Sequence, residues 1–137
     1  MHGGGTVRDR AADAGVSLSG VHSGFAWVVI GANAAVGLWA LGAHRLPRLR
    51  RRALWWATLA AELSVFVEVA LGAALVGDQD RQAGQFHAFY GFVAIVAVGV
   101  LYSYRSQLRH RIYLLYGLGG LFVVGLAIRA VQIPARP

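Results

Sequence analysis

The fold is decided by the stretch Phe86–Tyr104, which reads FHAFYGFVAIVAVGVLYSY. It has no charged residue, and its length matches the ~20 residues that an α-helix needs to cross a ~30 Å hydrocarbon core. Three similar apolar stretches fill most of the remaining chain and predict helices at about 21–43, 53–76 and 112–131. The sequence therefore predicts an all-α integral membrane protein with four bilayer-spanning helices.

The composition agrees with this class of protein. The chain has 137 residues, of which 57% are hydrophobic and 14% charged, whereas soluble domains carry about 25% charged residues. Residues 1–20 are expected to form a polar N-terminal tail, which lacks the apolar segment of a signal peptide. Residues 21–132 are expected to form a single four-span domain, because the loops are too short to fold a soluble core.

The absence of cysteine excludes disulfides, thiolate-bound iron–sulfur clusters, c-type haem attachment and cysteine-ligated zinc. All thirteen Lys and Arg residues are arginine, and alanine, glycine and valine are abundant. This bias indicates a GC-rich genome and hence a bacterium. We therefore expect a multi-pass protein of the bacterial inner membrane.

The distribution of arginine predicts the orientation of the helices. Arginines crowd the loop between the first two helices and the loop between the last two, whereas the middle loop carries Asp78, Asp80 and one arginine, Arg81. Positive loops stay in the cytoplasm, so both termini should lie outside. Short loops predict an up-down-up-down four-helix bundle. The arginines of the two basic loops are Arg45, Arg48, Arg50, Arg51, Arg52, Arg105, Arg109 and Arg111.

The net charge of +7 does not indicate nucleic-acid binding, because the basic residues lie in two short loops beside the membrane and form no stripe. The expected partners are the lipid bilayer and either other membrane subunits or a second copy of the chain. Small residues are expected at the contacts between helices, where close backbone approach stabilises packing in lipid. The candidates are Gly24, Gly31, Gly91, Gly99, Gly117, Gly120 and Gly125.

His22 and His87 are the first candidate site. They lie near the outer ends of the first and third helices, which run in the same direction, so they should sit at similar depth. Two imidazoles facing each other across a bundle can be the axial ligands of a b-type haem. Gly91 and Ala26 each follow one of the histidines by four residues and leave space for a flat macrocycle. One alternative is a metal site with Glu68, and the plainest alternative is an interfacial or hydrogen-bonding role for the two histidines.

Glu62 and Glu68 are the second candidate site, because ionisable groups inside a bilayer are costly and commonly functional. The two lie six residues apart on one helix and point roughly 120° apart, so they do not form a carboxylate pair. Glu62, near mid-membrane, is a candidate proton carrier for transport or else a neutral carboxyl group hydrogen-bonded to Asn33 or to backbone. Arg129 is expected either to extend to the outer surface or to pair with Glu68.

No phosphate loop, zinc-peptidase motif or catalytic triad pattern occurs in the sequence. An enzyme is therefore not expected. The sequence favours a non-catalytic accessory subunit of a larger membrane complex, respiratory in kind, which can bind one b-type haem through His22 and His87. The alternatives are a proton-coupled small transporter working as a homodimer and a purely structural membrane protein.

Overall fold

The computed structural model describes the backbone of residues 7–79 and 85–133, and the side chains of residues 20–75 and 86–133. The described chain is helical throughout, with short turns between helices and no strand in these ranges. Four of its helices are long and apolar enough to cross a membrane, which confirms the predicted all-α, multi-span class. In chain order the elements are α1 (Val7–Arg45), η1 (Pro47–Leu49), α2 (Arg52–Gln79), α3 (Gln85–Tyr104), η2 (Arg109–Arg111) and α4 (Ile112–Gln132).

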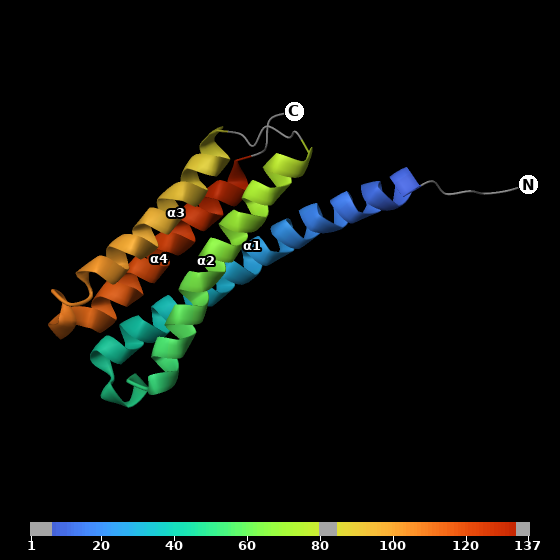
Figure 1. Ribbon diagram of the computed structural model, residues 1–137. Helices are drawn as coiled ribbons and strands as arrows, with labels where there is room; N and C mark the ends of the chain where they lie inside the picture. The colour runs from blue at the N-terminus through green and yellow to red at the C-terminus, as the bar shows by residue number, and fades with distance from the viewer. Residues whose placement is uncertain (1–6, 80–84, 134–137) are drawn as a thin grey trace, which may run out of the picture.

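Helix α1 is longer than the apolar pattern predicts. It begins at Val7 rather than near residue 21, and its membrane-compatible part starts at Gly20. In Figure 1 the first turns of α1 extend away from the other three helices. Hydropathy marks only the part of a helix that can lie in lipid, whereas backbone hydrogen bonding can continue the helix through polar residues.

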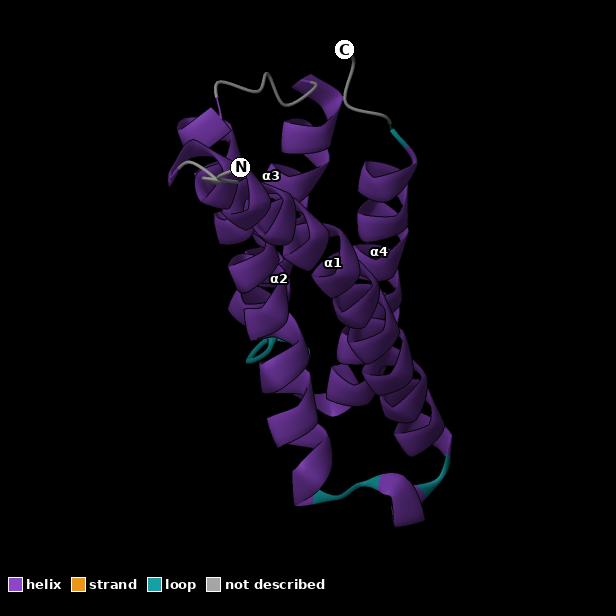
Figure 2. Cartoon of the chain, turned by 90° about the vertical axis from the view of Figure 1, so that its right-hand side faces the viewer, coloured by secondary structure: helices purple, strands orange, loops and turns teal. Residues whose placement is uncertain are grey.

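The four helices do not pack equally closely against one another. Helix α1 packs most extensively against α4 and next against α2, α4 also packs against α3, and the contact between α2 and α3 is much sparser. Figures 1 and 2 show α1 crossing α2 at an angle, and Figure 1 shows α3 running beside α4. Two buried clusters fill the interior, one of Val29, Val65, Ala94, Val98 and Val123, the other of Ala40, Ala43, Leu54 and Tyr116.

Glycines form the closest helix contact, between α1 and α4. A methyl group added at Gly37 would lie 3.2 Å from the Gly117 carbonyl oxygen, and one at Gly120 would lie 3.4 Å from the Gly37 Cα. Gly119 packs directly against Leu101 of α3. Small residues thus bring the α4 backbone close to two neighbours, as expected where van der Waals packing drives helix association.

The prediction of seam glycines is correct for three residues and wrong for four. Gly117, Gly120 and Gly91 face neighbouring helices, whereas a methyl group at any of the others would meet nothing within 4 Å among the described residues. Gly37 and Gly119 face neighbours but were not predicted. The rotation of each helix about its axis decides this, and helices that are apolar on all sides give no stripe from which to read it. The four misassigned glycines are Gly24, Gly31, Gly99 and Gly125.

Candidate functional site

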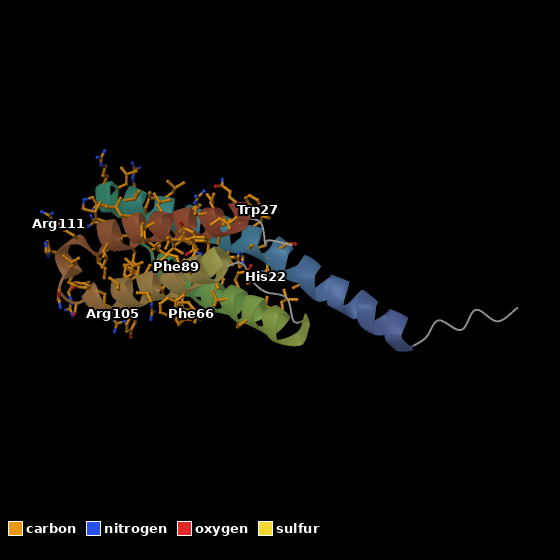
Figure 3. All side chains as sticks on the ribbon, turned by 90° about the horizontal axis from the view of Figure 1, so that it is seen from above. His22, Trp27, Phe66, Phe89, Arg105 and Arg111 are labelled. Carbon is orange, nitrogen blue, oxygen red and sulfur yellow. The ribbon has the colours of Figure 1, made fainter. Side chains whose placement is uncertain are left out.

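The two predicted haem ligands come together in the structure. His22 lies in the first turn of the apolar part of α1, and His87 lies in the first turn of α3. Their rings have centroids 5.9 Å apart and planes inclined at 77°. Figure 3 shows His22 far from the end of the bundle that carries Arg105 and Arg111. The two imidazoles therefore meet edge to face at one end of the spans.

Each imidazole has its Nδ1 atom beside an oxygen. His87 Nδ1 lies 3.1 Å from the backbone carbonyl oxygen of Ala130 on α4. His22 Nδ1 lies 3.0 Å from Glu68 Oε1 on α2. A carbonyl can only accept, so the His87 contact is a hydrogen bond when Nδ1 carries the proton. This tautomer leaves the lone pair of His87 Nε2 free to bind a ligand.

The His22–Glu68 contact has a short distance but poor alignment. The atoms are within hydrogen-bond range, yet His22 Nδ1 has no aligned hydrogen-bond partner within the described chain, and neither does Glu68 Oε2. Both side chains are largely buried, with exposed fractions of 20% and 14%. Buried polar atoms are normally satisfied. A modest rotation of either side chain would align the pair, with Glu68 accepting from the His22 ring.

Gly72 provides the space that His22 occupies. A methyl group at this position would lie 3.2 Å from His22 Cε1 and 3.6 Å from His22 Nε2. Gly72 follows Glu68 by four residues, so one face of α2 carries both the carboxylate and the gap that receive His22. This role of Gly72 was not predicted. The sequence feature that could have indicated this role is the four-residue spacing between Gly72 and Glu68.

Gly91, which was expected to leave space after His87, lies instead against Val69 of α2, where an added methyl group would be 3.6 Å from Val69 Cγ2. Ala26 is half-buried. Glu68 contacts His22 rather than Arg129, and Arg129 is exposed. Within the described residues, no group of three or more His, Cys, Asp or Glu side chains is placed to hold a metal ion. The contacts of this end of the bundle therefore centre on the two histidines.

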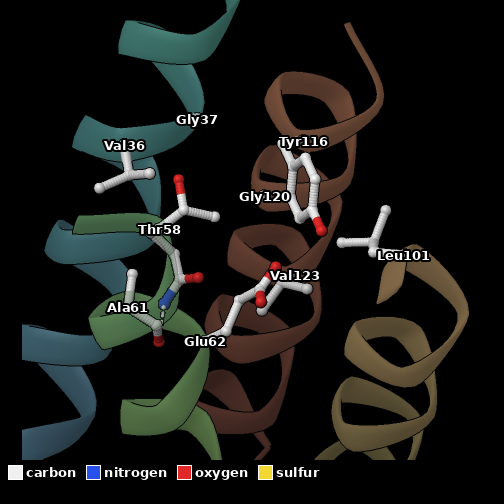
Figure 4. Close-up of a pocket in the computed structure, with 10 residues that line it drawn as sticks. Val36, Gly37, Thr58, Ala61, Glu62, Leu101, Tyr116, Gly120 and Val123 are labelled. Atoms are coloured by element: carbon white, nitrogen blue, oxygen red, sulfur yellow. Dashed lines mark hydrogen bonds between the residues drawn. The ribbon is translucent and has the colours of Figure 1, made fainter. Parts of the chain in front are cut away.

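Glu62 lies apart from the histidine pair, in a small interior cavity of about 10 Å³. The polar side chains around it are Asn33 of α1, Thr58 of α2 and Tyr116 of α4. Figure 4 shows the Glu62 carboxylate and the Tyr116 hydroxyl pointing into the space between α2 and α4. A cavity of roughly this volume with several polar partners can hold one water molecule.

Asn33 does not donate its amide hydrogens to Glu62. Its Nδ2 atom donates to the backbone carbonyls of Val29, at 2.9 Å, and Ala61, at 3.1 Å. The second of these bonds joins α1 to α2 in the middle of the spans. Thr58 donates to the Leu54 carbonyl of its own helix at 2.8 Å. Among these cavity residues, Glu62 and Tyr116 therefore remain the candidates for an exchangeable polar contact.

His44 and His110 lie at the other end of the bundle. His44 is in the last turn of α1 and half-buried, and His110 is exposed in η2. They serve as internal controls for the pair formed by His22 and His87.

No family model, curated protein or solved structure matches this chain. Its class follows from its own helices, four of which have the length and apolar character of membrane spans. The chain is thus a small multi-pass membrane protein.

Proposed function

We propose that this protein is a non-catalytic accessory subunit of a membrane complex and holds one b-type haem between His22 and His87. The observation that carries the proposal is the spacing of the two rings, whose centroids lie 5.9 Å apart. A metal–nitrogen bond is about 2.0 Å long and the nitrogen lies about 1.2 Å from its ring centre, so two imidazoles on opposite sides of one metal have centroids about 6.4 Å apart. The two rings here are slightly closer, and His22 would turn its Nε2 atom from Gly72 toward His87 to share a metal with it.

The surroundings of the two rings support the same arrangement. Histidines that bind metals usually donate their second ring nitrogen to a carboxylate or a backbone carbonyl, which fixes the ring and its tautomer. Glu68 and the Ala130 carbonyl stand in these positions beside His22 and His87. The macrocycle would be admitted between α2 and α3, the most loosely packed neighbours. A haem bound by two histidines supplies one-electron transfer.

The experiment that tests this function is the visible spectrum of the full chain, purified in detergent after expression with ample haem. We expect a sharp Soret band that shifts on reduction. A colourless protein, also when isolated within its native complex, would contradict the proposal and leave the purely structural alternative.

An accessory role fits the short connections between the spans at the arginine-rich end. The connections that contain η1 and η2 span residues 46–51 and 105–111, which is too little chain to form a site for a soluble substrate. Its partners would therefore approach laterally within the membrane, as subunits of a respiratory assembly do. A complex larger than the single chain on a native gel of mildly solubilised membranes is the expected result.

We also propose the up-down-up-down orientation with both termini outside, in a bacterial inner membrane. Both arginine-rich turns lie at the end of the bundle away from the start of α1 and the end of α4 (Figure 1), and positive loops stay in the cytoplasm. A cysteine introduced at Gly3 or Gly77 should react with an impermeant thiol reagent added to intact cells, and one at Pro47 should not. The chain has no native cysteine to interfere, and the opposite labelling would overturn this orientation.

The cavity around Glu62 favours a second candidate function, proton-coupled transport by a homodimer. A carboxyl group beside a water-sized space and the Tyr116 hydroxyl can exchange a proton near mid-membrane. If it does so during transport, Glu62→Gln should abolish proton-coupled flux in proteoliposomes, because the amide keeps the shape but cannot exchange a proton. Thr58→Ser, which keeps a hydroxyl at the cavity, serves as the matched control. Unchanged flux in Glu62→Gln would contradict this function.

A further inference from the structure

One side-chain contact links the two arginine-rich turns. Arg50, next to η1, contacts the ring of Tyr113 at the start of α4, with its guanidinium carbon 5.1 Å from the ring centroid. Tyr113 follows η2 by two residues. The sequence placed these basic segments in separate loops, and the structure joins them at Tyr113.

Arg50 stabilises the η1 turn through side-chain hydrogen bonds to the end of α1. Its Nε atom donates to the Ala43 carbonyl at 2.9 Å, and its Nη2 atom donates to the His44 carbonyl at 3.2 Å. These are carbonyls of the last turn of α1, where a cation is favoured by the helix dipole and by unsatisfied backbone groups. Trp39 donates its Nε1 to the Leu49 carbonyl at 3.0 Å and fixes the same turn. The η1 turn is thereby tied to both α1 and α4.

The other arginines of the two basic segments are free to meet a partner. All of them are exposed, and no aspartate or glutamate occurs in residues 44–61 or 102–116. Their positive charge is therefore uncompensated by the protein at this end. We define the basic face as Arg45, Arg48, Arg50, Arg51, Arg52, Arg105, Arg109 and Arg111.

The position of the basic face at the ends of the spans indicates which kind of partner it can meet. Exposed aromatic side chains accompany the arginines, with exposed fractions of 67% for Trp56, 55% for Tyr102 and 49% for Tyr104. Trp and Tyr at the ends of spans favour the headgroup level of a bilayer. Arg105 also lies over the Tyr102 ring, 3.7 Å from its centroid. The short turns keep the arginines at this depth, where lipid phosphates are the nearest anions.

We propose that the basic face binds anionic lipid headgroups of one membrane leaflet through the guanidinium groups of the two turns. Arginine suits this role because its planar fork donates two parallel hydrogen bonds to phosphate oxygens. The proposal is independent of the haem, since the histidine pair lies at the opposite end of the bundle (Figure 3).

The test is native mass spectrometry of the full chain with phosphatidylglycerol and phosphatidylcholine of identical acyl chains. We expect preferential retention of phosphatidylglycerol. Near a membrane surface each basic residue contributes about five-fold in affinity. The variant Arg48→Gln/Arg51→Gln/Arg109→Gln/Arg111→Gln should therefore lower retention more than about ten-fold. It removes none of the Arg50 contacts. The matched control is Arg129→Gln, which changes an exposed arginine outside the basic face and should retain the lipid as the unaltered chain does.

The proposal would be overturned by equal retention of both lipids or by unchanged retention in the fourfold variant. It would also be overturned if Arg129→Gln lost as much retention as the fourfold variant. Displacement of the lipid by a short DNA duplex would also overturn it, because the face would then be a general polyanion surface. If the fourfold variant loses its helical circular dichroism signal, the proposal is tested instead by the salt dependence of phosphatidylglycerol retention in the unaltered chain. In 1 M salt the Debye length is about 3 Å, and the preference for phosphatidylglycerol should disappear.

Discussion

If the protein holds the proposed haem, replacing His22 or His87 by alanine should abolish the low-spin spectrum of the purified protein. His22 and His87 lie on different helices with ring centroids 5.9 Å apart, so neither can replace the other as a ligand. Loss of one imidazole leaves one coordination position to water or to nothing, which changes the spin state or releases the haem. The measurement is the Soret band, oxidised and reduced, normalised to protein.

His44→Ala and His110→Ala are the matched controls for this experiment. Both residues lie at the other end of the bundle, and His110 is exposed in η2. These variants should keep the spectrum of the unaltered protein. A coloured protein whose spectrum survives His22→Ala would contradict the assignment of His22, and the same holds for His87. A spectrum lost in all four variants would point to general unfolding, which circular dichroism would reveal.

The positions of the spans follow closely from the sequence. Predicted helices at about 53–76, 86–104 and 112–131 correspond to α2, α3 and α4, which end within a few residues of these limits. This is because a bilayer fixes the length of the apolar run and requires every backbone group inside it to be hydrogen-bonded. Only α1 departs clearly, because a polar helical extension carries no hydropathy signal.

The position of a residue along its span was predictable, whereas the direction in which it faces was not. His22 and His87 lie close together because each is near the same end of its helix, whereas haem ligation by them stays a prediction. Glu68 was considered as a partner of Arg129, but the structure turns it toward His22. Similarly, Gly37 was not singled out although it lies in the closest contact between α1 and α4. Facing depends on helix rotation and on which helices are neighbours, and both are tertiary properties.

The two carboxylates show the same limit. Helical periodicity alone separates Glu62 from Glu68, and the structure does place them in different surroundings. That Tyr116 shares the cavity of Glu62 could not be predicted, because Tyr116 lies far along the chain on α4. Its placement depends on the close glycine contact between α1 and α4.

Substituting Gly117 by alanine should destabilise the bundle far more than the same change at Gly125. A methyl group at Gly117 would lie 2.6 Å from two side-chain atoms of Leu41 and 3.0 Å from its backbone nitrogen. Rotation of the Leu41 side chain relieves only part of this overlap, so α1 and α4 must separate. Overpacking of this kind typically costs about 1–3 kcal/mol.

The comparison with Gly125 separates the effect of the contact between α1 and α4 from the effect of helix propensity. Both glycines lie inside α4, so alanine brings both the same gain in helix propensity, up to about 1 kcal/mol. At Gly125 the added methyl group meets nothing within 4 Å among the described residues, and the position is exposed. Thermal unfolding in detergent, followed by tryptophan fluorescence, should give a lower midpoint for Gly117→Ala and an unchanged or higher one for Gly125→Ala. Equal midpoints would show that α1 and α4 do not approach each other at Gly117.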